Sequence, residues 1–447
     1  MFENILYQPV IEQLKADAGS GFLAPALLFS GPPYGGKGAA ALELARVLSC
    51  EGTETGKWNC PCPSCRRHRN LISPDLIILG KKGFFQEISA CSAALVRHTK
   101  GANNSGEQER ILLPVRMLFI RSIRKLLARF NPVLWEDDSK FGKISPQLNA
   151  LEEDLEELEG LFKAGTVELE KPCASIMKRA AKLESEGLGE LIPIAQIRRA
   201  SWWSRLAPLG KHKCIIIENA GHMQEGAKNA LLKILEEPPP RLTLVLTSPY
   251  PMSLLPTMLS RLRDYRFVTR DPGAEQEVIS RIFRGPENYT GGLESYLGSF
   301  LPFKAGNLYA LGAYLASSVA AEAVRELRSR MREIPPILLD QGKFFTGIAE
   351  GEGMGRPAVN YKTLLAKILT DTDNFEIPGL FSQFFRELGS LISRWLRSGR
   401  GSPEKALWAA RWRKEINRSL VEADSFNIAV PTVLERFLET LKTGMIA

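Results

Sequence analysis

The 447-residue sequence predicts an α/β fold in its N-terminal half and helical domains after it. Three observations support this prediction. An apolar run, Ala26–Ser30, is followed by a glycine-rich loop and then by a helical pattern at 39–48. A second apolar run at 213–217 has the length and composition of a buried strand and ends at Glu218. After residue 273 the pattern of apolar residues becomes helical.

The loop between the first strand and the first helix is a phosphate-binding loop (P-loop, 31–38) that lacks its last expected residue. Its sequence follows the pattern G-x-x-x-x-G-K-[ST] until the final position, where Gly stands instead of Ser or Thr. Backbone N–H groups and the lysine of such a loop hold phosphates, and the hydroxyl binds Mg²⁺. We therefore predict a degenerate nucleotide site that includes Gly31, Pro32, Gly36, Lys37 and Gly38.

The end of the second predicted strand supports the same interpretation. Such a strand normally ends in Asp-Glu, which supplies one carboxylate for the metal and one that orients the attacking water. Here the two residues are Glu218 and Asn219, and the amide of Asn219 cannot act as a base. The changes at Gly38 and Asn219 together indicate a nucleotide-binding fold that has lost hydrolysis, and they leave nucleotide binding open.

Four cysteines lie close together after the first helix. Cys50, Cys60, Cys62 and Cys65 suit a structural Zn²⁺, which prefers four thiolates in a tetrahedron. Their spacing is less regular than a paired C-x-x-C, and His68 is an alternative ligand. The other interpretation is a set of scattered cytosolic thiols. Disulfides fit poorly because the N-terminus does not resemble a secretory signal, so we expect a cytoplasmic protein.

Two helical patterns of opposite charge lie between the two strand motifs. Leucines recur at alternating spacings of three and four from Leu148 to Phe162, with glutamates between them. Upstream, residues 110–130 combine Arg and Lys with Leu, Ile and Phe. We predict that a basic and an acidic helix pack together as a projecting hairpin. Contact of the basic helix, through Arg121, Arg124 and Arg129, with DNA or with a partner is the less favoured alternative.

These features, in this order, resemble the delta-prime subunits of the bacterial DNA polymerase III clamp loader, which belong to the AAA+ superfamily. The resemblance implies an α/β AAA+ core with a parallel sheet that is covered by helices on both faces. The most specific segment is the run Asn-Ala-Leu-Leu-Lys-Ile-Leu-Glu-Glu-Pro-Pro at 229–239. Further matching segments are 27–32, 73–76, 194–198 and 259–261.

The resemblance alone implies two further site assignments. In this family the sequence Ser-Arg-Cys presents an arginine to the ATP of a neighbouring subunit, and Ser260-Arg261-Leu262 matches it except at the third position. Arg261 is therefore expected to be catalytic in trans, where its guanidinium stabilises charge on the transferring phosphoryl group. Polar residues near Thr247 and Ser248 are expected to sense the nucleotide state. The arginine expected in the lid is absent from 305–311.

The resemblance also implies how the chain is divided and assembled. We expect an AAA+ core, interrupted by a helical insertion, then a helical lid and an all-helical collar that joins subunits into a circular hetero-oligomer. The expected ranges are 1–270 for the core, 82–191 for the insertion, 271–334 for the lid and 335–447 for the collar.

The resulting hypothesis is a clamp loader subunit for DNA replication that does not hydrolyse ATP itself. It supplies an arginine to ATP that is bound with Mg²⁺ on a neighbouring gamma or tau subunit. Its expected partners are gamma/tau, delta, primer-template DNA and, through the complex, the sliding clamp. The net charge of +8 permits DNA contact without establishing it, and no apolar run is long enough to span a membrane. The alternatives are an active gamma/tau-like or other AAA+ ATPase, with Glu218 binding Mg²⁺, and an unrelated DNA-binding scaffold.

Overall fold

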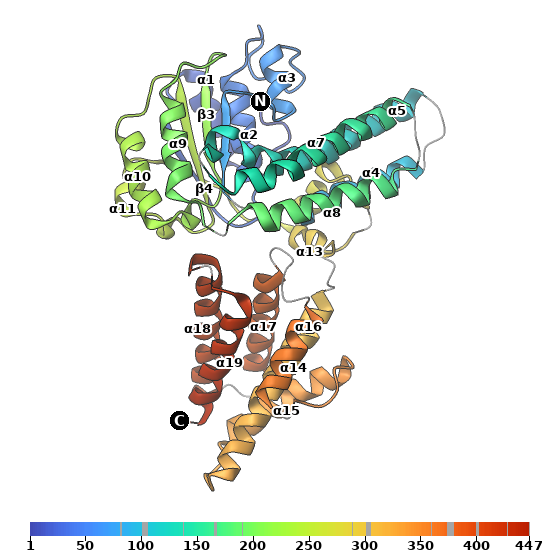
Figure 1. Ribbon diagram of the computed structural model, residues 1–447, viewed down its shortest axis with the longest axis vertical. Coiled ribbons are helices and arrows are strands. Elements are labelled where there is room, and N and C mark those ends of the chain that lie inside the picture. The colour runs from blue at the N-terminus through green and yellow to red at the C-terminus, as the bar shows by residue number, and fades with distance from the viewer. Residues whose placement is uncertain are drawn as a thin grey trace. The chain divides into compact units, whose positions relative to one another are not determined.

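The chain forms two compact units, Met1–Phe300 and Leu301–Ala447, each of which is described by itself (Figure 1). The structure is a computed structural model. It describes residues 1–80, 83–100, 106–136, 138–164, 168–189, 191–287, 289–300, 305–358, 360–372, 380–398, 402–426 and 428–446.

The N-terminal unit is built on a five-stranded sheet with the strand order β2-β3-β4-β1-β5. All four pairings between these strands are parallel. The carboxyl ends of the strands therefore meet at one end of the sheet, where the P-loop follows β1 and Glu218 follows β3. The strands are β1 (Ala26–Ser30), β2 (Leu76–Leu79), β3 (Lys213–Ile217), β4 (Leu242–Ser248) and β5 (Arg263–Arg266).

Helices cover both faces of this sheet. Side chains on a strand alternate between the two faces, so Leu27 and Leu28 of β1 belong to different cores. The core around Leu27 includes side chains of α1 (Val10–Ser20) and α2 (Lys37–Leu48). The core around Leu28 includes side chains of α4 (Phe84–Lys100), α5 (Gly106–Leu127) and the four helices α7 to α10, which lie between residues 141 and 236. The predicted α/β class, with a parallel sheet between two layers of helices, is confirmed.

Thirteen α-helices are described in this unit, together with short 3-10 and π segments. The remaining α-helices are α3 (Pro63–Arg69), α4 (Phe84–Lys100), α5 (Gly106–Leu127), α6 (Pro132–Trp135), α7 (Phe141–Lys163), α8 (Glu170–Gly187), α9 (Ile194–Ser204), α10 (Glu225–Glu236), α11 (Pro256–Leu259), α12 (Pro272–Glu277) and α13 (Leu293–Gly298).

The basic and acidic helices predicted within the insertion are α5 and α7, whose ribbons overlap in the view of Figure 1. Leu148, Leu151 and the other apolar residues of the α7 seam are buried. Arg124 of α5 pairs with Glu159 of α7 at 3.2 Å. The arrangement differs from the predicted hairpin of two helices, because α5 packs mainly along α4, and α8 packs along both α7 and α4. Together these four helices cover apolar side chains that two helices would leave exposed.

The C-terminal unit consists of helices in the part that the structure describes. Its first helix, α14, shares one core with the helices that follow it, and Leu311 of α14 and Trp395 of α17 are both fully buried there. The compact unit therefore begins earlier than the predicted collar, because α14 packs with later helices. The helices are α14 (Ala305–Ser329), α15 (Pro336–Gly351), α16 (Tyr361–Asp371), α17 (Leu380–Arg397), α18 (Pro403–Phe426) and α19 (Val430–Ile446).

No helix in the described parts of either unit combines the length and the apolar composition that crossing a membrane requires.

Candidate functional site

The P-loop links β1 to α2 in a conformation that depends on glycine. Gly31 and Gly36 have φ angles of 125° and 91°. A Cβ at Gly31 would lie 2.2 Å from the carbonyl oxygen of Phe267, so a larger residue there would have to displace the backbone. Lys37 begins α2 and is buried, and its Nζ donates to the carbonyl oxygen of Gly31 at 2.6 Å. The loop thus lies between a strand and a helix, as the sequence predicts, and its lysine is bonded to the loop itself.

Arg270 holds the same loop from the segment after β5. Its Nη1 donates to the carbonyl oxygen of Tyr34 at 2.7 Å, and its Nη2 donates to that of Gly35 at 3.2 Å. Its Nε donates to the carbonyl oxygen of Leu6 at 3.0 Å, which ties the loop to the N-terminal segment. Arg270 was not predictable from the sequence, because no motif marks a side chain that binds loop carbonyls.

Gly38 lies directly against the carboxylate of Glu218. A Cβ at position 38 would lie 2.2 Å from Oε1 of Glu218 and 3.4 Å from its Cδ. The Ser or Thr that normally ends a P-loop could therefore not be accommodated unless Glu218 moved. The Glu218 carboxylate can therefore lie where it does only because position 38 has no side chain.

The carboxylate of Glu218 is paired with the guanidinium of Arg129. Arg129 lies in the short turn η1 (Ala128–Phe130) that directly follows α5. Its Nη2 lies 2.6 Å from Oε2 of Glu218, and the two side chains are only 3% and 9% exposed. Burial lowers the pKa of Arg129, and the neighbouring Glu218 opposes that effect. Arg129 is therefore an internal residue, and the alternative that it contacts DNA is wrong.

The other predicted nucleotide-sensing residues also lie at this end of the sheet. Thr247 and Ser248 end β4 opposite Phe29 and Ser30 of β1, and both are buried. The backbone N–H of Asn219 donates to Oγ1 of Thr247 at 3.1 Å. The structure thus brings Glu218, Asn219, Thr247 and Ser248 to the strand ends that carry the P-loop. A role in sensing a nucleotide stays a prediction.

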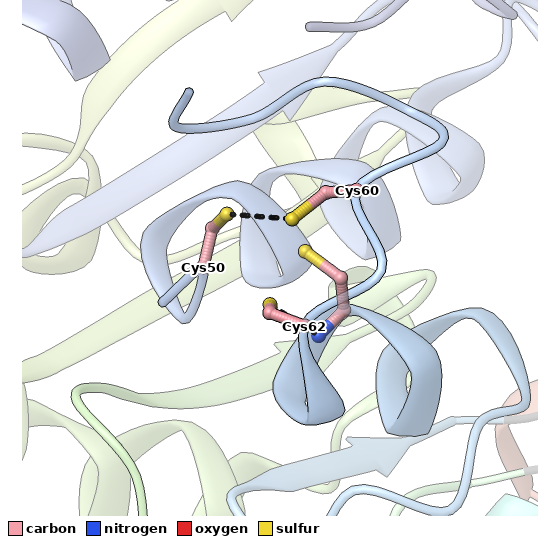
Figure 2. A group of neighbouring side chains, drawn as sticks. Cys50, Cys60 and Cys62 are labelled. Atoms are coloured by element: carbon pink, nitrogen blue, oxygen red, sulfur yellow. Dashed lines mark hydrogen bonds between the residues drawn. The ribbon is translucent and has the colours of Figure 1, made fainter. Parts of the chain in front are cut away.

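The four predicted metal ligands come together in space. The Sγ atoms of Cys50, Cys60, Cys62 and Cys65 all lie within 4.8 Å of one another, and Figure 2 shows the three labelled side chains converging. Sγ of Cys50 and Sγ of Cys60 are 3.7 Å apart. A tetrahedron with Zn–S bonds of about 2.3 Å has sulfur atoms about 3.8 Å apart, so the donor set fits Zn²⁺. In the described part of the chain, His68 is outside this group.

The surroundings of the cysteines act in opposite directions: burial raises the pKa of Cys65, an effect that Arg46 opposes, whereas hydrogen bonds favour the thiolate of Cys62. Nη1 of Arg46 donates to Sγ of Cys65 at 3.2 Å, and Arg46 also pairs with Glu43 at 2.6 Å. Burial raises the pKa of Cys62, but the backbone N–H groups of Cys65 and Glu51 outweigh it and lower the pKa to about 6. The cluster can therefore bind a metal ion, and Arg46 was a residue that the cysteine spacing could not reveal.

Arg261 lies at the opposite end of the sheet from the P-loop. It follows α11 and comes two residues before β5, whose first residue, Arg263, pairs with Leu27 near the start of β1. Its Nη2 lies 2.9 Å from Oε1 of Glu236, and its side chain is 36% exposed. Its Nη1 donates to the carbonyl oxygen of Thr257 at 2.7 Å. The structure therefore does not join Arg261 to the other predicted site residues.

A family model described as "DNA polymerase III, delta subunit" matches residues 7–131 and 170–271. These residues make up just over half of the chain. The chain belongs to this family. The matched segments include α4, α5 and α8, so the unmatched residues 132–169 form a shorter segment than the predicted insertion.

Curated relatives agree with this membership. The DNA polymerase III subunit delta' of Pseudomonas aeruginosa is 31% identical over 160 residues, which cover 35% of this chain and 48% of that protein. The subunit gamma/tau of Mycobacterium tuberculosis is 33% identical over 72 residues, which cover 16% of this chain and 12% of that protein. The chain thus matches less than half the length of either relative.

Among solved structures, a gamma subunit-related protein of DNA polymerase III from Thermotoga maritima is similar to this chain. It is 18% identical, with a TM-score of 0.29, and the similarity covers 57% of this chain and 81% of that one.

Proposed function

We propose that this chain is a delta-prime-type subunit of the bacterial clamp loader that supplies Arg261 to ATP on a neighbouring subunit. The family match and the delta' relative support the subunit type. The observation that carries the proposal is the position of Arg261, which is exposed at the amino ends of the strands while the P-loop lies at their carboxyl ends.

From this position Arg261 cannot reach a nucleotide in the chain's own P-loop. The five residues of β1 alone span about 17 Å, which is more than an arginine side chain can reach. An exposed guanidinium that is already oriented by Glu236 and Thr257 can instead meet a phosphate on another molecule. There it stabilises charge that develops on the transferring phosphoryl group.

The chain itself does not turn over ATP in this proposal. Position 38 has no hydroxyl for Mg²⁺, and position 219 has an amide where a water-orienting carboxylate is needed. Glu218, the remaining acidic residue of the motif, is paired with Arg129. The rival function, an active gamma/tau-like ATPase in which Glu218 binds Mg²⁺, would require that this pair separate.

The cysteine cluster binds structural Zn²⁺ and fixes the segment after α2. The four thiolates would satisfy the metal completely and leave no position for a substrate. Its contribution is therefore stability of the subunit, and the chemistry remains on the partner's nucleotide.

The partners of this cytoplasmic subunit follow from the same proposal. They are gamma/tau, which holds ATP and Mg²⁺, delta, primer-template DNA and the sliding clamp through the complex. The unit Leu301–Ala447, which includes α14, serves as the collar that holds the ring of subunits together, and residues 271–300 serve as the lid. The net charge of +8 favours an approach to DNA at low ionic strength.

The test is the DNA-stimulated ATPase of a complex reconstituted from this chain, gamma/tau, delta and the clamp. Removal of an arginine finger costs on the order of 10³-fold or more in kcat at the site that it serves. We expect Arg261→Ala to abolish the share of turnover that comes from the adjoining site and Arg261→Lys to restore little of it, because lysine lacks the planar guanidinium.

The matched control is Arg263→Ala, which removes an exposed arginine two residues away and should leave turnover unchanged. Assembly is followed by size-exclusion chromatography. Full activity of Arg261→Ala in an intact complex would refute the proposal. ATP turnover by the pure chain that Lys37→Ala abolishes would favour the active ATPase instead.

A further inference from the structure

The Arg129–Glu218 pair lies where a P-loop protein holds its divalent cation. In such proteins the hydroxyl of the loop and an acidic residue after the third strand bind Mg²⁺. Here the hydroxyl is missing, and the carboxylate of Glu218 occupies space beside Gly38 that a side chain would fill. A buried carboxylate needs a compensating charge. The guanidinium of Arg129 supplies it at 2.6 Å.

We propose that Arg129 permanently replaces the divalent cation at Glu218, so that this P-loop is a site from which Mg²⁺ is excluded. The inference rests on the part of the proposed function in which the chain does not hydrolyse ATP. It is independent of Arg261, because it concerns only the chain's own loop.

The guanidinium is fixed on more than one side. Nε of Arg129 donates to the carbonyl oxygen of Gly80 at 3.0 Å, at the carboxyl end of β2. Its Cζ lies 5.2 Å from the ring centre of Phe84, at the start of α4. Because arginine presents several N–H donors in a rigid plane, it can bind the carboxylate and the carbonyl at once. Lysine could supply the charge without this geometry.

The helix directly before Arg129, α5, is itself attached at several positions. Lys125 of α5 pairs with Glu87 of α4, and Arg124 pairs with Glu159 of α7. Nη1 of Arg121 donates to the carbonyl oxygen of Arg69, at the end of α3, the helix that contains Cys65. These contacts hold α5 in place, so Arg129 has no easy route away from Glu218.

The surroundings are also unsuitable for hydrated Mg²⁺. This ion requires six oxygen ligands at about 2.0–2.1 Å and usually keeps several water molecules. The Glu218 and Arg129 side chains are 9% and 3% exposed, and the guanidinium already lies against the carboxylate. Entry of Mg²⁺ would require that Arg129 leave and that water enter.

The first test is a double-mutant cycle on the full chain. Arg129→Met leaves Glu218 buried without this partner and should lower the urea midpoint of unfolding markedly. Arg129→Met with Glu218→Gln removes both charges and should recover most of that loss. Recovery supports the pairing, and a double variant as unstable as Arg129→Met would overturn it. If Arg129→Met does not fold, a double variant that does fold supports the pairing, and a double variant that also fails to fold overturns it.

The second test asks whether Mg²⁺ binds at Glu218 once Arg129 has been replaced. The urea midpoints of the wild type, Glu218→Gln and, where it folds, Arg129→Met are measured in magnesium chloride and in sodium chloride of equal ionic strength. Mg²⁺ prefers oxygen ligands to thiolates, so the cysteine cluster should not respond. We expect Mg²⁺ to stabilise only Arg129→Met. If Mg²⁺ raises the urea midpoint of the wild type equally but does not raise that of Glu218→Gln, the proposal is overturned. It is also overturned if Arg129→Met folds and its urea midpoint does not change with Mg²⁺.

ATP turnover by the pure wild-type chain is measured in parallel. Mg²⁺ binding at Glu218 without turnover would refute this inference and leave the proposed function standing. Normal activity of the Arg261→Ala complex would refute the proposed function and leave this inference standing.

Discussion

Nη1 of Arg46 lies 3.2 Å from Sγ of Cys65, and this contact connects the helix after the P-loop to the cysteine cluster. The same guanidinium donates to the carbonyl oxygens of Gly56 and Lys57, within the loop that carries the cysteines. A cation in this position offsets the negative charge that four thiolates leave around a divalent metal. The cysteine cluster is therefore linked to α2 by this side chain as well as by Cys50, which closely follows α2 in the sequence.

Replacement of Arg46 should weaken metal binding. Loss of an outer-shell partner typically reduces metal affinity about 10- to 100-fold, and we expect a loss of this size for Arg46→Met. The measurement is competition for Zn²⁺ with a coloured chelator. Arg66→Met, in the exposed part of α3, is the matched control and should bind as the wild type does. Equal affinity in all three proteins would show that Arg46 has no influence on the metal.

The cysteine cluster should hold one Zn²⁺ per chain. Emission spectrometry of the purified wild type should show this stoichiometry, and Cys62→Ser should lose the metal because a structural site requires all four ligands. Cys173→Ser is the control, since Cys173 is a buried thiol in α8 outside the cluster. Retention of full zinc content in Cys62→Ser would mean that another ligand completes the site.

Glu236 should act as a positioning residue for Arg261. The pair is half-exposed and hence worth at most about 1 kcal/mol, which corresponds to a few-fold effect. We expect Glu236→Gln to lower kcat of the reconstituted complex a few-fold with KM for ATP unchanged. Glu237→Gln, the exposed neighbour, should have no effect. A change in KM alone would argue against a role in orienting the guanidinium.

His68 should make stability depend on pH. Burial lowers its pKa to about 4, with Arg46, Arg67 and Arg121 adding to this effect and Asp75 opposing it. Between pH 6.5 and 4 the unfolded chain therefore binds a proton that the folded chain does not, so stability falls as pH falls. The loss approaches about 3 kcal/mol near pH 4.

The measurement is the urea midpoint of wild type and His68→Phe across this pH range, with zinc content followed at each point. The variant should lose the part of the slope that His68 contributes. Parallel curves for the two proteins would contradict the prediction. His98→Phe, at a half-exposed position in α4, is the control and should keep the wild-type slope.

Features that depend on neighbouring residues in the sequence were predictable. The P-loop, its flanking strand and helix, and the seam from Leu148 to Phe162 are local patterns whose periodicity and turn chemistry fix their structure. The cysteines were also predictable as a group, because thiolates at that density have few other uses.

Features that depend on distant residues were not predictable. Arg129 and Glu218 are separated by 89 positions, and in the sequence Arg129 looks like one more cation on a basic helix. The grouping of α14 with the later helices was missed for a similar reason. The prolines at 335 and 336 indicate a break in the helix, but only packing shows that the chain folds back across it.

Because all of its strand pairings are parallel, the sheet of the N-terminal unit has two different ends. Arg261 lies at one end of the strands and the P-loop at the other, so repeated contact between such units joins unlike surfaces, head to tail. If Arg261 acts in trans as proposed, each ordinary subunit of such a row supplies an arginine to one neighbour and receives one from the other. A subunit whose own P-loop is blocked by Arg129 would supply an arginine without receiving one, and it would therefore stand at one end of the row.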